Sequence, residues 1–183
     1  MINMEWLIFI IFILALVYFL IRQLVIIYNN MVMLKNNCYK AFANIDVLLK
    51  KQADLIPMLI VITQKAMDHE KSLFEKLAEN RNHYLRTDVL DQKVDLANQL
   101  LPQIKKSLII AEKYPELISG KNLHVLQAQA KELEECIADR REFFNQSVTL
   151  YNTEIHIFPN VLFKLLFNFK DIPLFYPSRE ATS

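Results

Sequence analysis

A single glycine, Gly120, occurs in this chain of 183 residues. Hairpins, sandwiches and doubly wound sheets use glycine in their turns, and phosphate loops need it where the backbone closely approaches the ligand. A chain of this length with one glycine is therefore predicted to be all-α, with few and short connections between its helices. The same scarcity excludes a phosphate loop.

The beginning of the chain is its most apolar part. Residues 6–21, WLIFIIFILALVYFLI, carry no charge and no polar amide, but as a helix they span only about 24 Å of a hydrocarbon core of about 30 Å. Arg22 interrupts the run before LVII extends it to Ile27. Because the arginine can snorkel to the interface, residues 6–27 are predicted to form a transmembrane anchor of about 33 Å in the lipid bilayer. Residues 1–5 are a short flank.

The alternative to an anchor is a cleaved signal peptide, which needs a basic start and a small-residue cleavage site. The chain begins MINME, with Glu5 and no Lys or Arg, and no Ala-x-Ala pattern follows the apolar run. We therefore predict a single uncleaved anchor. Basic residues follow its apolar core and none precedes it: Arg22, Lys35, Lys40, Lys50 and Lys51. The positive-inside rule then places the N-terminus outside and the C-terminal domain in the cytoplasm.

A second apolar stretch, residues 55–62, is too short to cross a membrane, and Pro57 argues against a central strand. We predict a helix junction there, with Asp54 as the N-cap and Pro57 in the first turn of the next helix. One helix then continues out of the anchor to about Lys51, and the next runs to about Leu85.

A third helix is predicted over residues 89–113, where Pro102 should kink it or split it in two. A turn follows in residues 114–122. The fourth helix is the clearest, because apolar residues recur every three or four positions across residues 123–158, with an average step of about 3.5, the seam of a helical bundle. Pro159 is expected to end it.

The remaining residues are predicted to form a short helical segment, residues 160–169, and a C-terminal tail, residues 170–183, that frays at its end. Four periodic segments with short links predict an antiparallel, up-down four-helix bundle over residues 28–169. The predicted fold is thus a single N-terminal transmembrane helix that continues into this bundle.

Four stretches, in this order, resemble the LemA family: YNNMVMLKNNCYKAFANIDVLLKKQADLIPMLI, MDHE, YPEL and IADRREFFNQSVTLYNTEIHIFP. The resemblance covers residues 28–169 approximately. It implies a membrane-anchored antiparallel helical bundle in the inner membrane of a bacterium, with its soluble domain in the cytoplasm, and it implies no reaction. The chain departs from the family pattern in two places. Near Ala41 and Phe42 the family usually carries a tryptophan or another aromatic mix, and here the aromatic is Phe42. Asn168 replaces the glycine between two phenylalanines, and asparagine is second to glycine in tolerating positive φ.

The sequence offers little material for a catalytic or metal site. A formal net charge of +1 argues against a nucleic-acid partner, which needs clustered Lys and Arg. Di-metal bundles need Glu-x-x-His, and none of the four histidines has a Glu three residues before it. Cys38 and Cys136 stand apart and are interpreted as small buried hydrophobic residues. We therefore predict a non-enzymatic protein without a cofactor or metal.

Arg140 lies on the apolar seam of the fourth helix, between Ile137 and Phe144. One interpretation is an anion-binding site inside the bundle. The favoured one is a structural ion pair with a carboxylate of the first or second helix, Asp46 first and Glu70 second, because a buried guanidinium needs such a partner.

A further polar set on the fourth helix consists of Asn145, Tyr151 and Asn152, which Asp46 could satisfy instead. Such a network most often fixes the register of helices. The predicted function is a membrane-anchored interaction or scaffold module with an unidentified protein partner, and the alternative is a ligand-sensing bundle. A cavity lined by Arg140 and this polar set would favour ligand sensing, whereas a packed core with an exposed apolar helix face would favour the interaction module.

Overall fold

The computed structural model describes the backbone of residues 4–63, 67–112 and 120–176, and the side chains of residues 4–61, 71–111 and 124–176. Within these ranges the chain is helical and contains no strand, which confirms the all-α prediction. The helices are α1 (Met4–Thr63), α2 (Met67–Arg86), α3 (Leu90–Glu112), α4 (Gly120–Glu154) and α5 (Asn160–Phe167).

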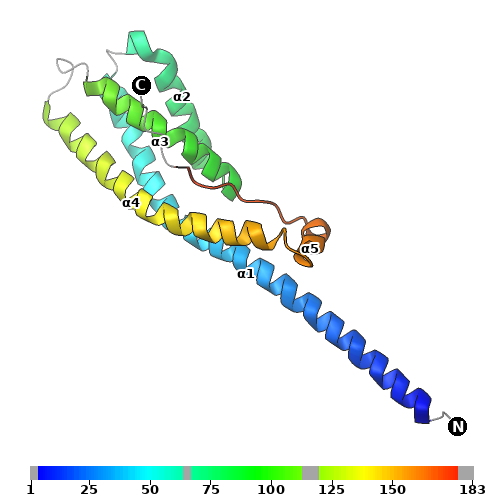
Figure 1. Ribbon diagram of the computed structural model, residues 1–183. Helices are drawn as coiled ribbons and strands as arrows, with labels where there is room; N and C mark the ends of the chain where they lie inside the picture. The colour runs from blue at the N-terminus through cyan, green and yellow to red at the C-terminus, as the bar shows by residue number, and fades with distance from the viewer. Residues whose placement is uncertain (1–3, 64–66, 113–119, 177–183) are drawn as a thin grey trace.

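The first helix organises the whole molecule. Figure 1 shows α1 as a long rod whose N-terminal part projects from the bundle, with α4 beside its second half and the α2–α3 pair at its far end. Two contacts show that α1 and α4 are antiparallel. Cys38 donates through Sγ to the carbonyl oxygen of Ser147 at 3.3 Å, and Arg140 Nη1 donates to that of Asn44 at 2.8 Å. The predicted bundle, continuous with the apolar segment, is confirmed.

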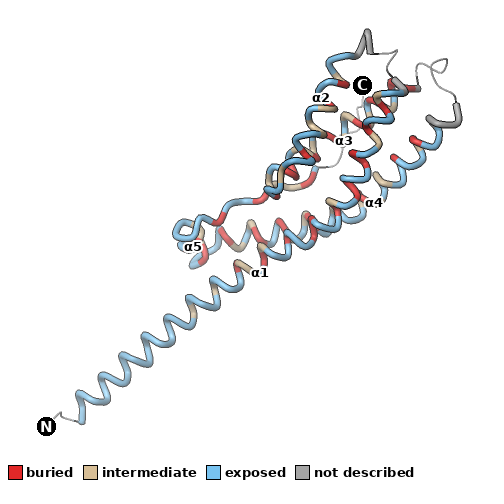
Figure 2. Tube along the Cα trace, turned by 180° about the vertical axis from the view of Figure 1, so that it is seen from behind, coloured by how far each residue is buried: buried red, intermediate tan, exposed pale blue. Residues whose placement is uncertain are grey.

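The N-terminal part of α1 is apolar and exposed. Among the described residues, α1 is the one helix long and apolar enough to cross a membrane, and an 18-residue window within it has a mean hydropathy of 2.7 and no buried residue. Packing begins at Ile27, which lies against the core, and Met31 is the first fully buried residue. Figure 2 shows the same boundary, because buried residues occur only in the bundle.

Two hydrophobic clusters form the core of the bundle. The larger joins residues 31–49 of α1 to α4, the start of α3, α5 and the segment after it. The smaller lies at the far end and is built from nine buried residues of four helices: Ala53, Ile56, Leu59, Phe74, Leu77, Leu100, Ile104, Ala111 and Leu126. The periodic apolar positions of each helix thus face one another, as the sequence pattern requires.

The predicted junction at Asp54 is wrong, because α1 continues through Pro57 to Thr63. A proline inside a helix cannot donate to the carbonyl four residues earlier, here that of Ala53. Arg81 of α2 replaces the missing donor: its Nε donates to the Ala53 oxygen at 2.8 Å, and its Nη2 lies 3.5 Å from Asp54 Oδ1. The helix therefore survives its proline because a second helix satisfies the exposed carbonyl.

Two prolines, Pro102 and Pro159, were expected to shape the later helices. Of the two alternatives at Pro102, a kink or a split, the split does not occur, because α3 is continuous. α4 ends at Glu154 rather than at Phe158, whose side chain is 77% exposed. Asn160 explains the earlier end, because its Nδ2 donates to both the carbonyl and a carboxylate oxygen of Glu154 at 3.0 Å. Of the turn predicted at residues 114–122, residues 114–119 lie outside the described residues, and residues 120–122 belong to α4.

The short C-terminal helix is confirmed as α5, and it ends at Asn168 with φ 54° and ψ 45°. Asparagine tolerates this left-handed conformation, so Asn168 ends the helix as the glycine of the family pattern would. The Phe169 N–H donates to the Lys164 carbonyl at 3.1 Å and closes the last turn. The chain then continues without regular structure through residues 169–176, which we call the strap.

Candidate functional site

The strap packs into the bundle instead of lying free. Phe169, Ile172 and Phe175 are all buried in the larger cluster. Figure 1 shows the segment returning from α5 towards α3 and α4. Phe169, Ile172 and Phe175 are spaced three residues apart, so every third residue of the strap packs an apolar side chain against the bundle. The first part of the predicted tail is thus a structural element of the core, while residues 177–183, where fraying was expected, lie outside the described residues.

Asparagine side chains hold the backbone of the strap. Asn145 of α4 donates to the Phe175 oxygen and accepts from the Phe175 N–H, both at 2.8 Å. Asn152 makes the same pair of bonds with Ile172, at 2.8 and 3.0 Å. Asn98 of α3 binds the strap from the other helix, donating to Leu174 O at 3.0 Å and accepting from Tyr176 N at 2.9 Å. Each asparagine amide therefore makes the hydrogen bonds to the strap backbone that a neighbouring strand would make in a sheet.

The spacing of the two asparagines on α4 is close to the spacing of the two strap residues that they bind. Asn145 and Asn152 are two helical turns apart, about 10.5 Å. Ile172 and Phe175 are three extended residues apart, about 10 Å. Tyr151 adds a bond from its hydroxyl to the Lys170 oxygen at 3.0 Å, and burial raises its pKa to about 12, so the phenol remains a donor at neutral pH. The predicted polar set thus fixes the strap.

Asp46 lies in a second polar cluster, at the junction of α1, α2 and α3. Its Oδ1 accepts from the Tyr84 hydroxyl at 2.5 Å and from Lys93 Nζ at 3.1 Å, while Oδ2 accepts from Lys50 at 2.8 Å. Lys93 is only 8% exposed, and its Nζ lies 5.5 Å from the centre of the Tyr84 ring. The cluster ties three helices together through one carboxylate.

Asp46 and Tyr84 keep their charge states near neutral pH. Burial raises the pKa of Asp46, but hydrogen bonds from Lys50, Tyr84 and Lys93 outweigh burial and hold it below its ordinary value. Burial, followed by the bond to Asp46, raises the pKa of Tyr84 well above its ordinary range. A carboxylate that stays ionised and a phenol that stays protonated do not exchange protons at neutral pH, which is the pattern of a structural site rather than an acid–base pair.

The predicted pairing of Arg140 with Asp46 is wrong. Arg140 is exposed, and its guanidinium reaches the Asn44 carbonyl instead. The seam steps from Ile137 to Phe144 by seven residues, so Arg140 falls at its edge. Glu70, the second predicted partner, belongs to α2, but its side chain lies outside the described residues.

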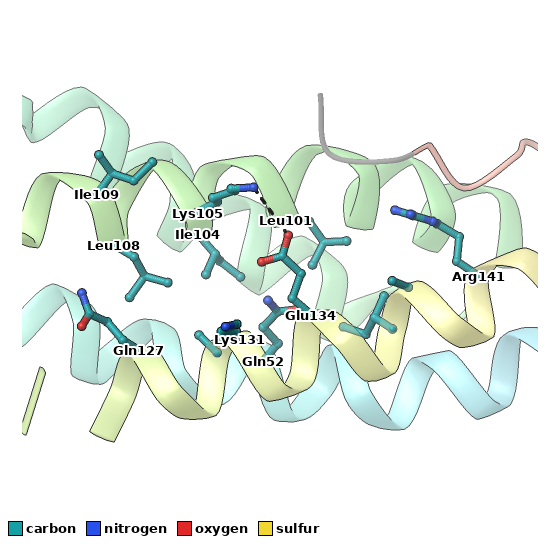
Figure 3. A pocket seen from close by; sticks show the side chains of 13 residues that line it. Gln52, Leu101, Ile104, Lys105, Leu108, Ile109, Gln127, Lys131, Glu134 and Arg141 are labelled. Carbon is teal, nitrogen blue, oxygen red and sulfur yellow. Dashed lines mark ion pairs between the residues drawn. The ribbon is translucent and has the colours of Figure 1, made fainter. Parts of the chain in front are cut away.

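A cavity of about 320 Å³ lies between α1, α3 and α4. Its walls are mainly apolar, from residues that include Leu101, Ile104, Leu108 and Ile137. Figure 3 shows an ion pair across it, Lys105 to Glu134, whose charged atoms are 3.8 Å apart. The cavity was not predicted, because it depends on how three helices meet.

Gln52 is the unusual residue of this cavity. It comes from α1 and is 4% exposed, and its Oε1 has no hydrogen-bond partner among the described residues. An unsatisfied buried acceptor costs about 1–3 kcal/mol. Figure 3 draws the side chain beneath Glu134, among the residues that line the space. A weak signal was present in the sequence, since Gln52 follows Leu48 and Leu49 at a core position of α1.

Sequence reasoning missed other residues of these sites. No role was predicted for Lys93, Asn98 or Arg81, although Lys93 lies one residue before the buried Val94 and three after the buried Leu90. Within the side chains described, no group of three or more His, Cys, Asp and Glu residues could hold a metal ion.

Fold and sites together define a class of protein: an all-α bundle built on one helix with an exposed apolar N-terminal segment, and closed by an asparagine-held C-terminal strap. The sequence model of the LemA family matches residues 41–183, and the chain belongs to the LemA family. The match extends through the strap. No curated protein matches the chain.

Proposed function

We propose that this LemA-family chain is a membrane-anchored interaction or scaffold protein without enzymatic activity. Residues 6–27 would hold it in the inner membrane of a bacterium, with the N-terminus outside and the bundle in the cytoplasm. The observation that carries the proposal is the continuity of α1: the same unbroken helix supplies the exposed apolar segment and the central element of the bundle core. Basic residues after the span support the orientation.

An anchor of this kind connects the bundle rigidly to the membrane-spanning segment. No break separates Ile27, where packing begins, from the segment before it. The outward face of α4 carries Phe143 and Leu150, which lie two turns apart and are 63% and 52% exposed. Exposed apolar residues on a helix face suit a protein partner. The fixed charge states around Asp46 support a role without proton-transfer chemistry.

Topology and partner can be tested in native membranes. Protease added to sealed inside-out vesicles should digest the bundle, and in right-side-out vesicles it should leave the bundle intact. A photo-crosslinking residue at Phe143 or Leu150 should join the full chain to one recurrent protein, while the same residue at Glu132, an exposed charged position on α4, should not. Crosslinking that is equal at all three positions contradicts a partner-binding face.

Ligand sensing is the second candidate function, and the unpartnered Gln52 oxygen favours it. A ligand that donates an N–H or O–H to Oε1 would remove the cost of the buried acceptor, while its apolar body lies against Ile104 and Leu108. Lys131 and Arg141 line the same cavity and suit an anionic group. The ligand class is therefore a small amphipathic carboxylate with one hydrogen-bond donor.

Indole-3-acetate and its N-methyl derivative are matched probes for this site, because they differ in the N–H donor. Calorimetric titration of the full chain in lipid nanodiscs, corrected with empty nanodiscs, should give at least about tenfold tighter binding of the N–H probe. Gln52→Leu should abolish that difference, and Gln146→Leu, an exposed position on α4, should preserve it. Equal binding of both probes, or no binding of either, contradicts the ligand site.

A further inference from the structure

The short helix α5 has an apolar face that nothing in the described chain covers. Leu162, Leu165 and Leu166 are 57%, 79% and 76% exposed. At 100° per residue they fall within one arc of about 100° on the helix. The opposite face carries Asn160 and Phe163, which are buried against the bundle. α5 therefore has one apolar face turned to the protein and a second turned away from it.

The charge distribution on α5 is the reverse of that expected for a helix in water. Its one charged residue, Lys164, is turned towards the strap, where Nζ lies 2.8 Å from Asp171 Oδ2 and 2.9 Å from His156 Nε2. The Lys164 side chain is only 20% exposed. A solvated helix carries its charges on the outer face. Here the outer face has leucines, and the lysine is engaged within the protein.

The position of α5 along α1 indicates what covers this face. The Phe167 ring lies 4.9 Å from the Tyr28 ring, measured between centroids, and the Phe169 ring lies 6.2 Å from it. Tyr28 directly follows the apolar segment of residues 6–27. Figures 1 and 2 both place α5 at the end of the bundle from which that segment projects. Phe158, 77% exposed, adds to the apolar surface just before α5.

We propose that α5 is a second membrane contact, in which Leu162, Leu165 and Leu166 enter the lipid surface beside the anchor. This proposal rests on the membrane insertion of residues 6–27 proposed above, because a spanning segment that ends at Ile27 sets the lipid–water boundary at the level of Tyr28. An apolar helix face at that boundary is buried about 5–10 Å deep, between headgroups and acyl chains. The occupant is the bilayer, because the apolar surface of α1 continues into that of α5.

Two points of contact restrict the bundle more than one does. A lone spanning helix can tilt and rotate in the bilayer. With α5 also seated in the lipid surface, a tilt of the anchor away from α5 would lift the leucines out of the lipid and is opposed. The strap is connected directly to α5, so the membrane contact, the asparagine bonds and the bundle core form one continuous unit.

Tryptophan fluorescence in liposomes tests this proposal with the full chain. Trp6 is the one tryptophan of the chain, and lipids brominated along their acyl chains quench tryptophans that they touch. In a Trp6→Phe background, Leu165→Trp should be quenched, most strongly by lipids brominated near the headgroup. Val125→Trp is the matched control: it is an exposed apolar position on α4, about 40 Å from the Tyr151 end of that helix, and should stay unquenched.

The outcomes separate this proposal from the function on which it rests. Quenching of Trp6 in the natural sequence, together with no quenching of Leu165→Trp, leaves the anchor standing and overturns the α5 contact. A blue-shifted but unquenched Leu165→Trp also overturns it, because the face is then covered by protein, such as a second copy of the chain. An unquenched Trp6 overturns both proposals. Leu166→Lys added to Leu165→Trp should reduce quenching to the level of the control, and an unchanged thermal melt should show that the fold is kept.

Discussion

Arg81 shows how one side chain can decide the course of a helix. A proline in the interior of a helix costs about 3 kcal/mol or more, partly through the carbonyl it leaves unpaired. The guanidinium meets that carbonyl at Ala53 and also lies near the Asp54 carboxylate. The Pro57 side chain faces solvent, so the ring disturbs no packing. The cost of the proline is offset from outside α1.

Arg81→Met should therefore lower the free energy of unfolding by about 1–3 kcal/mol, because it leaves the Ala53 oxygen unsatisfied. Urea titration of the full chain in detergent, followed by circular dichroism, measures the loss. In a Pro57→Ala background, residue 57 itself supplies the N–H, and the same substitution should cost clearly less. Equal losses in the two backgrounds would show that Arg81 acts through something other than the proline.

Asp46 gives the bundle a defined dependence on pH. Its pKa in the folded chain is below the ordinary 3.8. A carboxyl group of this kind contributes stability that is fully present above its unfolded pKa and is lost as the pH falls through the folded pKa. The contribution is therefore constant at neutral pH and disappears in strong acid.

Asp46→Asn isolates this contribution. The difference in free energy of unfolding between the natural chain and the variant should stay constant from pH 7 to about 5 and shrink below about 3.8. Asp91→Asn, in the first turn of α3, serves as the control for a carboxylate outside the cluster. A difference that grows towards low pH would contradict the assignment of Asp46 as the ionised centre of the cluster.

At the level of elements, the strap is the part that local sequence patterns describe least well. It is neither helix nor strand, and it gains its hydrogen bonds from amide side chains of α3 and α4. The spacing of Asn145 and Asn152 was visible in the sequence, but their partner lies in the segment predicted as a C-terminal tail that frays at its end. Long-range side-chain contacts, rather than local propensity, order this segment.

Asn145→Leu and Asn152→Leu should each destabilise the chain by about 1–3 kcal/mol, because each leaves a backbone N–H and carbonyl of the strap without a partner. Thr149→Val, on the exposed face of the same helix, should change the free energy by less than about 0.5 kcal/mol. Hydrogen exchange should report faster exchange at Ile172 for Asn152→Leu and at Phe175 for Asn145→Leu. Unchanged exchange at both amides would contradict the pairing.

At the level of the whole molecule, the sequence predicted the architecture well and the polar contacts poorly. One glycine, one apolar segment and a long seam were sufficient for an all-α bundle on a long N-terminal helix. The same pattern misplaced Arg140, because a step of three along a helix does not distinguish the centre of a seam from its edge. Pairings such as Asp46 with Lys93 depend on the relative rotation of three helices, which periodicity does not determine.

The bundle should fold without residues 1–27, since every buried residue of both core clusters lies after Ile27. A fragment that starts at Tyr28 should show a helical circular-dichroism spectrum and a cooperative melt, and neither should change on addition of a chelator. Loss of helix with chelator would reveal a structural metal. A fragment that stays unfolded would show that the anchor itself contributes to folding.

The length of the unbroken α1 also determines how far the α2–α3 end of the bundle lies from the apolar segment. From Ile27 to Thr63 the helix rises about 54 Å at 1.5 Å per residue, so in the proposed anchored arrangement an upright α1 would hold the α2–α3 end of the bundle about 54 Å from the lipid surface. The α4 face with Phe143 lies near Asn44 of α1 and would therefore be closer to the bilayer. On this proposal, membrane proteins with short domains reach only the half of the bundle near the anchor, and among membrane proteins only those whose domains extend tens of ångströms from the bilayer reach the α2–α3 end.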